Sequence, residues 1–138
     1  MAKIEVTVPM VDWLLYNLPA LRTQVEEAGA GGGVPGPGSR HADASNPTAA
    51  IAVCRASLSV VLDTAEKTVH GLHPESRKVY RLKYRERLSY GRIAHRAFIS
   101  DSTAKRRANE IRAAVKAALS LLPQSTLREF VAFTDGES

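Results

Sequence analysis

Five polar residues lie close together after Asp101, and their side chains suit one kind of chemistry. The five are Ser102, Thr103, Lys105, Arg106 and Asn109. Arg and Lys match the acceptor edge of guanine, Asn matches adenine, and Ser or Thr can bond a base or a phosphate. The stretch therefore holds a candidate base-reading set, provided that a helix presents the five side chains on one side.

The apolar residues of the same stretch predict that helix. Ala104, Ala108, Ile111 and Val115 are spaced by four, three and four residues. At about 100° per residue they fall on one helical face, which we expect to be buried. The candidate reading residues then fall on the opposite face or on its flanks, where a ligand could reach them.

A second set of residues could hold DNA phosphates. Ser89, Tyr90 and Arg92 stand at the expected start of a short helix, where backbone N–H groups and positive charge favour an anion. Arg107 lies nearer the inward face of the long helix, so a phosphate and an intramolecular partner are both open for it. The full set of predicted phosphate contacts is Ser89, Tyr90, Arg92, Arg107 and Arg112.

These two sets fit a helix-turn-helix, in which one short helix supports a second helix in the major groove. Ile93, Ala94 and Ala97 give the first helix an apolar side, and Ser100 can cap the second helix. Phe98 occupies the turn position that is usually glycine, so either the turn is strained or its geometry differs. A plain helical bundle with a cationic outer face is the structural alternative.

Charge is distributed unevenly along the chain of 138 residues, whose net charge is +5. Residues 73–116 contain 13 Lys or Arg and four Asp or Glu, which makes this segment +9 and the remainder −4. A basic module beside an acidic remainder indicates a polyanionic partner, which here would be double-stranded DNA.

The elements that must position these residues are all predicted to be helical. We expect an all-α protein with an N-terminal helical part and a C-terminal helix-turn-helix DNA-binding domain. The expected parts are an arm and helix (1–28), a flexible Gly/Pro-rich loop (29–47), a long connecting helix (48–72), the helix-turn-helix domain (73–122) and a C-terminal tail (123–138) with a short helical turn near Leu127. Pro19 is expected to kink or restart the first helix.

The stretch HPESRKVYRLKYRERLSYGRIAHRAFISDSTAKRRANEIRAAV (73–115) resembles region four of sigma factors. With WLLYNLPALRTQVEE and NPTAA upstream, the wider layout resembles the ArpU and RinA-like late transcription regulators of phages. The resemblance covers roughly residues 10–120. It implies sequence-specific DNA binding by a phage- or prophage-encoded activator of late or packaging genes in the bacterial cytoplasm, with host RNA polymerase as a further partner.

Two other functions use the same features. A small terminase subunit also carries a helix-turn-helix, but it assembles as a ring that recognises phage DNA for packaging. A protein-interaction module could instead use the basic face to bind an acidic protein. Because one small helix-turn-helix rarely binds tightly alone, we also expect a homo-oligomer.

Enzymatic and metal chemistry find no support in the residue pattern. The glycine run at 29–38 lacks the Gly-Lys-Ser/Thr of a phosphate loop. Cys54, His70 and His73 lack the second cysteine of a usual zinc site, and no nucleophile has a base near it in the sequence. We therefore expect no enzyme activity, cofactor or metal, and the N-terminus predicts neither a signal peptide nor a membrane span.

Overall fold

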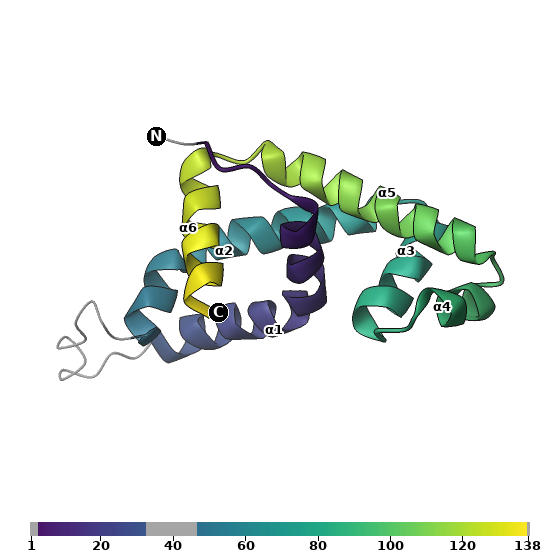
Figure 1. Ribbon diagram of the computed structural model, residues 1–138. Helices are drawn as coiled ribbons and strands as arrows, with labels where there is room; N and C mark the ends of the chain where they lie inside the picture. The colour runs from purple at the N-terminus through teal and green to yellow at the C-terminus, as the bar shows by residue number, and fades with distance from the viewer. Residues whose placement is uncertain (1–2, 33–46, 138) are drawn as a thin grey trace. The chain divides into compact units, whose positions relative to one another are not determined.

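The computed structural model describes the backbone of residues 3–32 and 47–137 and the side chains of residues 3–27 and 55–134. Within these ranges every regular element is a helix, which confirms the all-α fold class (Figure 1). The elements are α1 (Val8–Gly32), α2 (Pro47–His70), α3 (Pro74–Tyr80), the π-helical segment η2 (Arg81–Arg85), α4 (Tyr90–Ala97), α5 (Asp101–Ser120) and α6 (Gln124–Glu137).

The first helix, predicted from the leucine spacing to run from about Val11 to Ala28, is longer than that at both ends. It begins at Val8, where the Thr7 hydroxyl accepts from the Met10 N–H at 3.3 Å, and Pro9 stands in the first turn. Proline is well tolerated there because the first-turn N–H groups have no helical partner. Residues 29–32, expected in the loop, are helical, and the rest of that predicted loop up to residue 46 lies outside the described residues.

Pro19 does not interrupt α1, which is one continuous helix from Val8 to Gly32. Leu15 and Leu21 are buried on either side of the proline, so packing continues past the missing backbone donor. The predicted restart of the helix at Pro19 is therefore wrong.

The C-terminal tail is also more ordered than predicted. Residues 124–137 form a complete helix, α6, instead of a short turn. Leu127 and Phe130 are about 1% exposed and lie three residues apart, so they share one helical face. Burial of that face stabilises a helix longer than the short turn that the local sequence pattern predicted.

The chain divides into two compact units. Unit 1 contains Met1–Ile4, Leu18–Asp63 and Leu122–Ser138, and unit 2 contains Glu5–Asn17 and Thr64–Leu121. Two polar contacts join segments of unit 1 that are distant in the sequence. Arg22 pairs with Asp63 at 2.7 Å, and the Ile4 N–H donates to Gln124 Oε1 at 2.7 Å.

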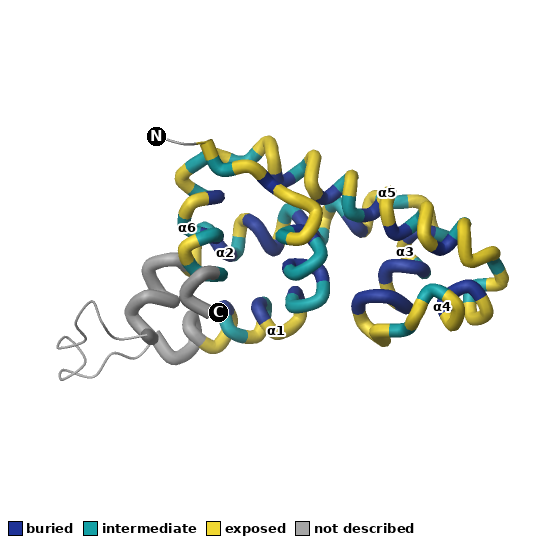
Figure 2. Tube along the Cα trace, in the orientation of Figure 1, coloured by how far each residue is buried: buried dark blue, intermediate teal, exposed yellow. Residues whose placement is uncertain are grey.

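Unit 2 carries all of the predicted site residues. In it α3, α4 and α5 pack on one another, and their facing sides are buried (Figures 1 and 2). Ile93 of α4 and Ala104, Ala108 and Ile111 of α5 have no exposed surface. Two alanines at this contact allow the helices to approach closely, which is the arrangement expected from their spacing.

Between α3 and α4 the chain does not follow one regular helix. The backbone widens to the π-helical form over η2, and the Leu88 N–H then donates to the Leu82 carbonyl at 3.0 Å. Leu82, Lys83 and Tyr84 are consecutive and all buried. An ordinary α-helix would not bury three consecutive residues on a narrow face, so the sequence periodicity alone did not predict this segment.

Candidate nucleic-acid interface

The start of α4 is fixed by a serine cap. Ser89 has an extended backbone, and its hydroxyl accepts from the Arg92 N–H at 3.4 Å. Arg92 supplies no carboxylate to bond back to Ser89, so only one half of a capping box is present. The Arg92 side chain is exposed and has no ion pair with any described residue, so it remains available to an anion.

The turn between α4 and α5 has three residues, Phe98, Ile99 and Ser100, and the first of them is left-handed. Phe98 has φ 58° and ψ 45°, and the Ile99 N–H donates to the Ala94 carbonyl at 3.0 Å. Of the two possibilities for this position, the chain adopts the conformation that usually selects glycine. Phe98 therefore carries backbone strain, because a side chain disfavours this region.

Ser100 ends the turn and begins α5. Its hydroxyl accepts from the Thr103 N–H at 3.0 Å, which satisfies one of the free donors of the first turn. The Thr103 hydroxyl lies 2.9 Å from the Ser100 hydroxyl, so Thr103 takes part in the cap. Thr103 is half-buried, whereas the other four predicted reading residues are exposed.

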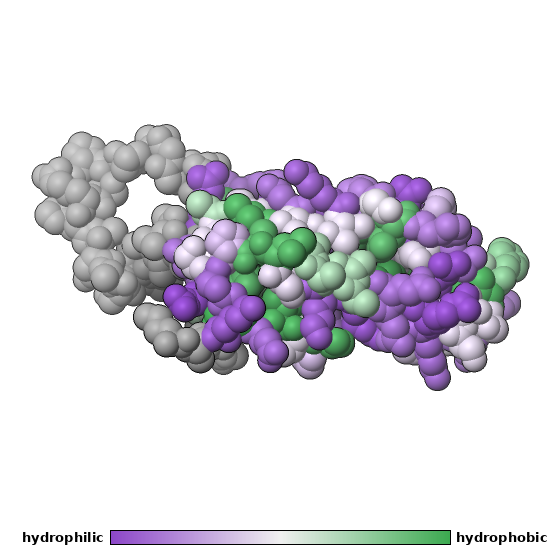
Figure 3. All heavy atoms as spheres, turned by 90° about the horizontal axis from the view of Figure 1, so that it is seen from above, coloured by the Kyte–Doolittle hydropathy of each residue, from purple (hydrophilic) through white to green (hydrophobic). Residues whose placement is uncertain are grey.

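The first turns of α5 therefore present a polar outer face, defined by Ser102, Lys105, Arg106 and Asn109. The buried face of the same helix is formed by Ala104, Ala108, Ile111, Val115 and Leu119. Arg106 keeps 64% of its side chain exposed and has a long 3.9 Å contact with Glu110. Such a contact costs little to break, so Arg106 can reorient toward a ligand. Figure 3 shows hydrophilic residues over much of the face that is seen from above, with hydrophobic patches between them.

Arg107, for which two roles were open, has intramolecular partners. Its Nε donates to Glu75 on α3 at 2.8 Å, and its Nη1 lies 3.1 Å from Glu110. The hydrogen bond from Arg107 lowers the pKa of the Glu75 carboxyl, and the same bond raises the pKa of Arg107. This ion pair ties α3 to α5 and leaves Arg107 less free to bind phosphate than Arg92.

Arg112, also predicted to contact phosphate, lies mostly inside unit 2. Its side chain is 15% exposed, its Nη1 lies 3.4 Å from Asp12 Oδ1, and its Nη2 donates to Asn109. Burial lowers the pKa of Arg112, but hydrogen bonds to Tyr90 and Tyr84 outweigh it, so the pKa lies above its ordinary value. Through its hydrogen bond to Asn109, Arg112 fixes the position of that predicted reading residue. The sequence pattern did not predict this role.

Asp12 is the acidic centre of a group of side chains inside unit 2, which we call the inner cluster. Its other members are Tyr16, Lys83, Tyr84, Tyr90 and Arg112. The Tyr84 hydroxyl donates to Asp12 Oδ1 at 2.7 Å, and Tyr84 is about 1% exposed. Burial, followed by the hydrogen bond to Asp12, raises the pKa of Tyr84 well above its usual range. The cluster therefore joins the N-terminal half of α1 to η2 and α5 within unit 2.

A buried lysine completes the cluster. Lys83 is 9% exposed, and its Nζ donates to the Tyr16 hydroxyl at 2.8 Å. The same ammonium lies 5.1 Å from the ring centroids of Tyr16 and Tyr84 and 5.0 Å from that of Tyr90. Aromatic faces attract a desolvated cation, so three tyrosines offset part of the cost of burying Lys83. This cage orients Tyr90 at the first residue of α4. The rings come from distant parts of the sequence, so no local pattern predicted the cage.

A small concave surface lies beside the outer side of α4. It has a volume of about 290 Å³ and is lined by Leu88, Gly91, Arg92, His95 and Arg96. A side chain at Gly91 would meet nothing within 4 Å, and its backbone needs no left-handed conformation. The fold itself therefore does not require glycine at this position.

In the described parts of the chain, the side chains form no group of three or more metal-ligating residues, and no helix is both long and apolar enough to cross a bilayer. Cys54 lies outside the described side chains.

Comparison with known proteins identifies no relative: no family model, curated protein or solved structure matches the chain.

Proposed function

We propose that this protein is a sequence-specific DNA-binding transcription regulator in which α4, the three-residue turn and α5 act as a helix-turn-helix. The outer face of α5 is the observation that carries the proposal. Its polar side chains are exposed opposite a fully buried apolar face, and they follow directly on a capped helix start. That is the arrangement a recognition helix needs, because its N-terminal turns enter the major groove.

The two sets of polar residues take different parts in this proposal. Ser102, Lys105, Arg106 and Asn109 read base edges, and Thr103 holds the helix start with Ser100. Ser89, Tyr90 and Arg92 position phosphate at the start of α4, where backbone N–H groups face outward. Arg107 and Arg112 act chiefly within the protein, since both are engaged with carboxylates.

The biological setting of the proposal depends on the sequence resemblance alone. By that resemblance, the protein is a phage- or prophage-encoded activator of late or packaging genes in the bacterial cytoplasm, and host RNA polymerase is a further partner. A homo-oligomer would supply two half-sites, and the affinity of two modules would exceed that of one.

The decisive experiment selects DNA from a random pool and compares the selected duplex with unrelated duplexes. Replacement Arg106→Ala should lower affinity for the selected duplex by about 5- to 150-fold, equivalent to about 1–3 kcal/mol for a lost base contact. Affinity for unrelated duplexes should fall much less. The matched control is Arg128→Ala, which removes the same charge from an exposed position on α6.

Other outcomes would reassign the function. Equal losses on selected and unrelated DNA would make Arg106 a phosphate contact, and absence of DNA binding at low salt would reject the proposal. A closed ring of many subunits in native mass spectrometry would favour the small terminase subunit. A dimer that protects a promoter from nuclease would favour the regulator.

A further inference from the structure

A second cationic surface lies on the outward side of α3 and η2. It consists of Arg77, Lys78, Arg81 and Arg85 together with Phe98, and we call it the α3 surface. The opposite side of the same segment is buried, including Ser76, Val79 and Lys83. The α3 surface is therefore made of residues that the core and the inner cluster of unit 2 do not use.

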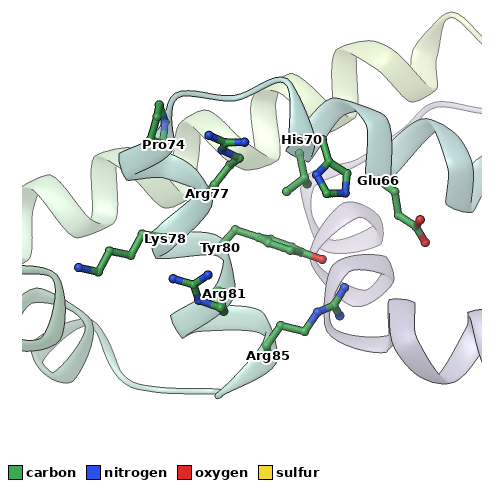
Figure 4. Close-up of a pocket in the computed structure, with 9 residues that line it drawn as sticks. Glu66, His70, Pro74, Arg77, Lys78, Tyr80, Arg81 and Arg85 are labelled. Carbon is green, nitrogen blue, oxygen red and sulfur yellow. The ribbon is translucent and has the colours of Figure 1, made fainter.

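The cations of the α3 surface border a cavity of about 570 Å³. Glu66 and His70 of α2 face them, and Tyr80 lies between the two sides (Figure 4). Val69 also lines the cavity. Arg77, Arg81 and Arg85 recur every four residues, so they follow one edge of the cavity instead of scattering around α3. The result is a concave basic site with an apolar and aromatic floor.

The charge of this cavity is not balanced by its lining. Four cations face a single carboxylate, Glu66. Arg85 lies over the ring of Tyr80, with its guanidinium carbon 5.2 Å from the centroid. Among the described residues, Arg77, Lys78 and Arg81 have no ion pair. An anionic ligand would therefore gain attraction from several charges at once.

Phe98 adds an apolar anchor next to this charge. Lys78 Nζ lies 6.0 Å from its ring centroid, and Lys78 also lines the cavity. The ring is 90% exposed and its backbone is left-handed. Both features are unfavourable for the isolated chain. Glycine at this position would remove the backbone strain, and a polar residue would remove the exposed apolar surface. A partner that covers the ring would recover the apolar contribution.

We propose that the α3 surface binds an acidic segment of another protein that carries at least one apolar side chain. The carboxylates would pair with Arg77, Lys78 and Arg81, and the apolar side chain would cover Phe98. A protein segment suits the site better than duplex DNA, because a narrow chain can enter a concave cavity and can bury an exposed aromatic ring. This interaction is independent of base reading by α5.

Fluorescence polarisation with two labelled peptides tests the proposal. In the first peptide Asp and Glu alternate with Leu, and in the second Ser replaces Leu. The first should bind about tenfold more tightly, as expected for one buried apolar anchor. Phe98→Gly should remove that difference while raising the melting temperature. The double replacement Arg77→Glu with Arg81→Glu should weaken both peptides by at least about tenfold, as expected when favourable charge pairs become repulsive.

The control is Arg128→Glu, which reverses one charge at an exposed position on α6 and is compared with Arg77→Glu alone. It should leave peptide binding unchanged. Equal weakening by this control would overturn the proposal, and so would failure of the Leu peptide to bind at low salt. Duplex DNA binding is measured in parallel on every variant. If the α3-surface replacements weaken DNA binding as much as peptide binding, the surface is a DNA contact and the protein-partner proposal is wrong.

Discussion

Unit 2 places cationic side chains in two contrasting settings. In the inner cluster, Lys83 lies among three tyrosines, and Arg112 is paired with Asp12. On the outer face of α5, Lys105 and Arg106 are exposed, and the contact of Arg106 with Glu110 is long. Residues of the same two types thus have opposite uses, and burial decides which use each one has.

The physical reason is the cost of desolvation. A cation removed from water must find hydrogen bonds, a counter-ion or aromatic faces, and the partners that supply them become fixed in turn. A cation that stays in water keeps its hydration and can exchange it for a phosphate or a base edge. Inner cations should therefore control the free energy of unfolding, and outer cations should control DNA affinity.

The largest effect is expected when the inner cluster loses its arginine. Arg112→Met should lower the free energy of unfolding by about 2–3 kcal/mol, because the hydrogen bonds to a charged group are lost and Asp12 is left with fewer partners. Urea unfolding followed by the fluorescence of Trp13, the single tryptophan, reports on unit 2.

The matched outer change is Arg106→Met. It should alter the free energy of unfolding by less than about 0.5 kcal/mol, as for most surface substitutions. If the two variants lost equal free energy of unfolding, the claim that buried cations control stability and exposed cations do not would be wrong. At temperatures where both variants are folded, Arg106→Met should lower DNA affinity more than Arg112→Met does.

A second effect concerns the pH dependence of the inner cluster. The pKa of Tyr84 is raised in the folded protein above the ordinary value of about 10. The unfolded chain therefore loses this proton first as pH rises, and the stabilising contribution, complete below about pH 10, declines above it. The slope contributed by Tyr84 grows through pH 10 and approaches about 1.4 kcal/mol per pH unit above it.

Tyr84→Phe tests that slope directly. Urea unfolding between pH 9 and pH 11 should show a shallower loss of stability in the variant than in the parent protein, although the variant starts lower because Asp12 loses a donor. Burial also raises the pKa of Tyr80, so some dependence should remain. An unchanged slope would show that Tyr84 is not held neutral by the inner cluster.

The smallest effect is expected at Gly91, on the outer side of α4. Gly91→Ala should raise the free energy of unfolding by about 0.5–1 kcal/mol, because alanine loses less backbone freedom and nothing stands within 4 Å of its methyl group. If a phosphate approaches the backbone there, DNA affinity should fall several-fold despite the gain in stability.

Gly71→Ala provides the control for Gly91. Its added carbon would lie 3.5 Å from the Lys67 carbonyl oxygen, an ordinary contact, and its position after α2 is outside the proposed DNA surface. DNA affinity should therefore stay unchanged in Gly71→Ala. If both variants bind DNA as tightly as the parent protein, Gly91 is not part of the interface. The proposed DNA surface is then limited to α5.

Local patterns predicted much of the helical framework. The apolar spacing along α5 and the serine caps at Ser89 and Ser100 are local signals, because helix geometry and capping depend on residues a few positions apart. The structure confirms these features. Local patterns were weaker at the ends, where α1 is longer than expected and the tail forms α6.

Residues far apart in the sequence decide the rest. When α5 is considered alone, the type and position of Arg112 are those of a phosphate contact. In the folded protein, Asp12, 100 residues away in the sequence, holds its side chain inside unit 2. Lys83 likewise resembles its exposed basic neighbours until Tyr16 and Tyr90 surround it. No helical periodicity encodes these partners, since their meeting depends on how α1, η2, α4 and α5 pack.

The sequence by itself thus determined the helical class, the basic module and the face of α5 proposed to read DNA, because these follow from composition and from spacing within single helices. Only the tertiary structure decided which cations lie inside, that Phe98 stands strained and exposed, and that the outer side of α3 borders a basic cavity. Burial and desolvation are properties of packed elements, and they separate residues that look equivalent in the sequence.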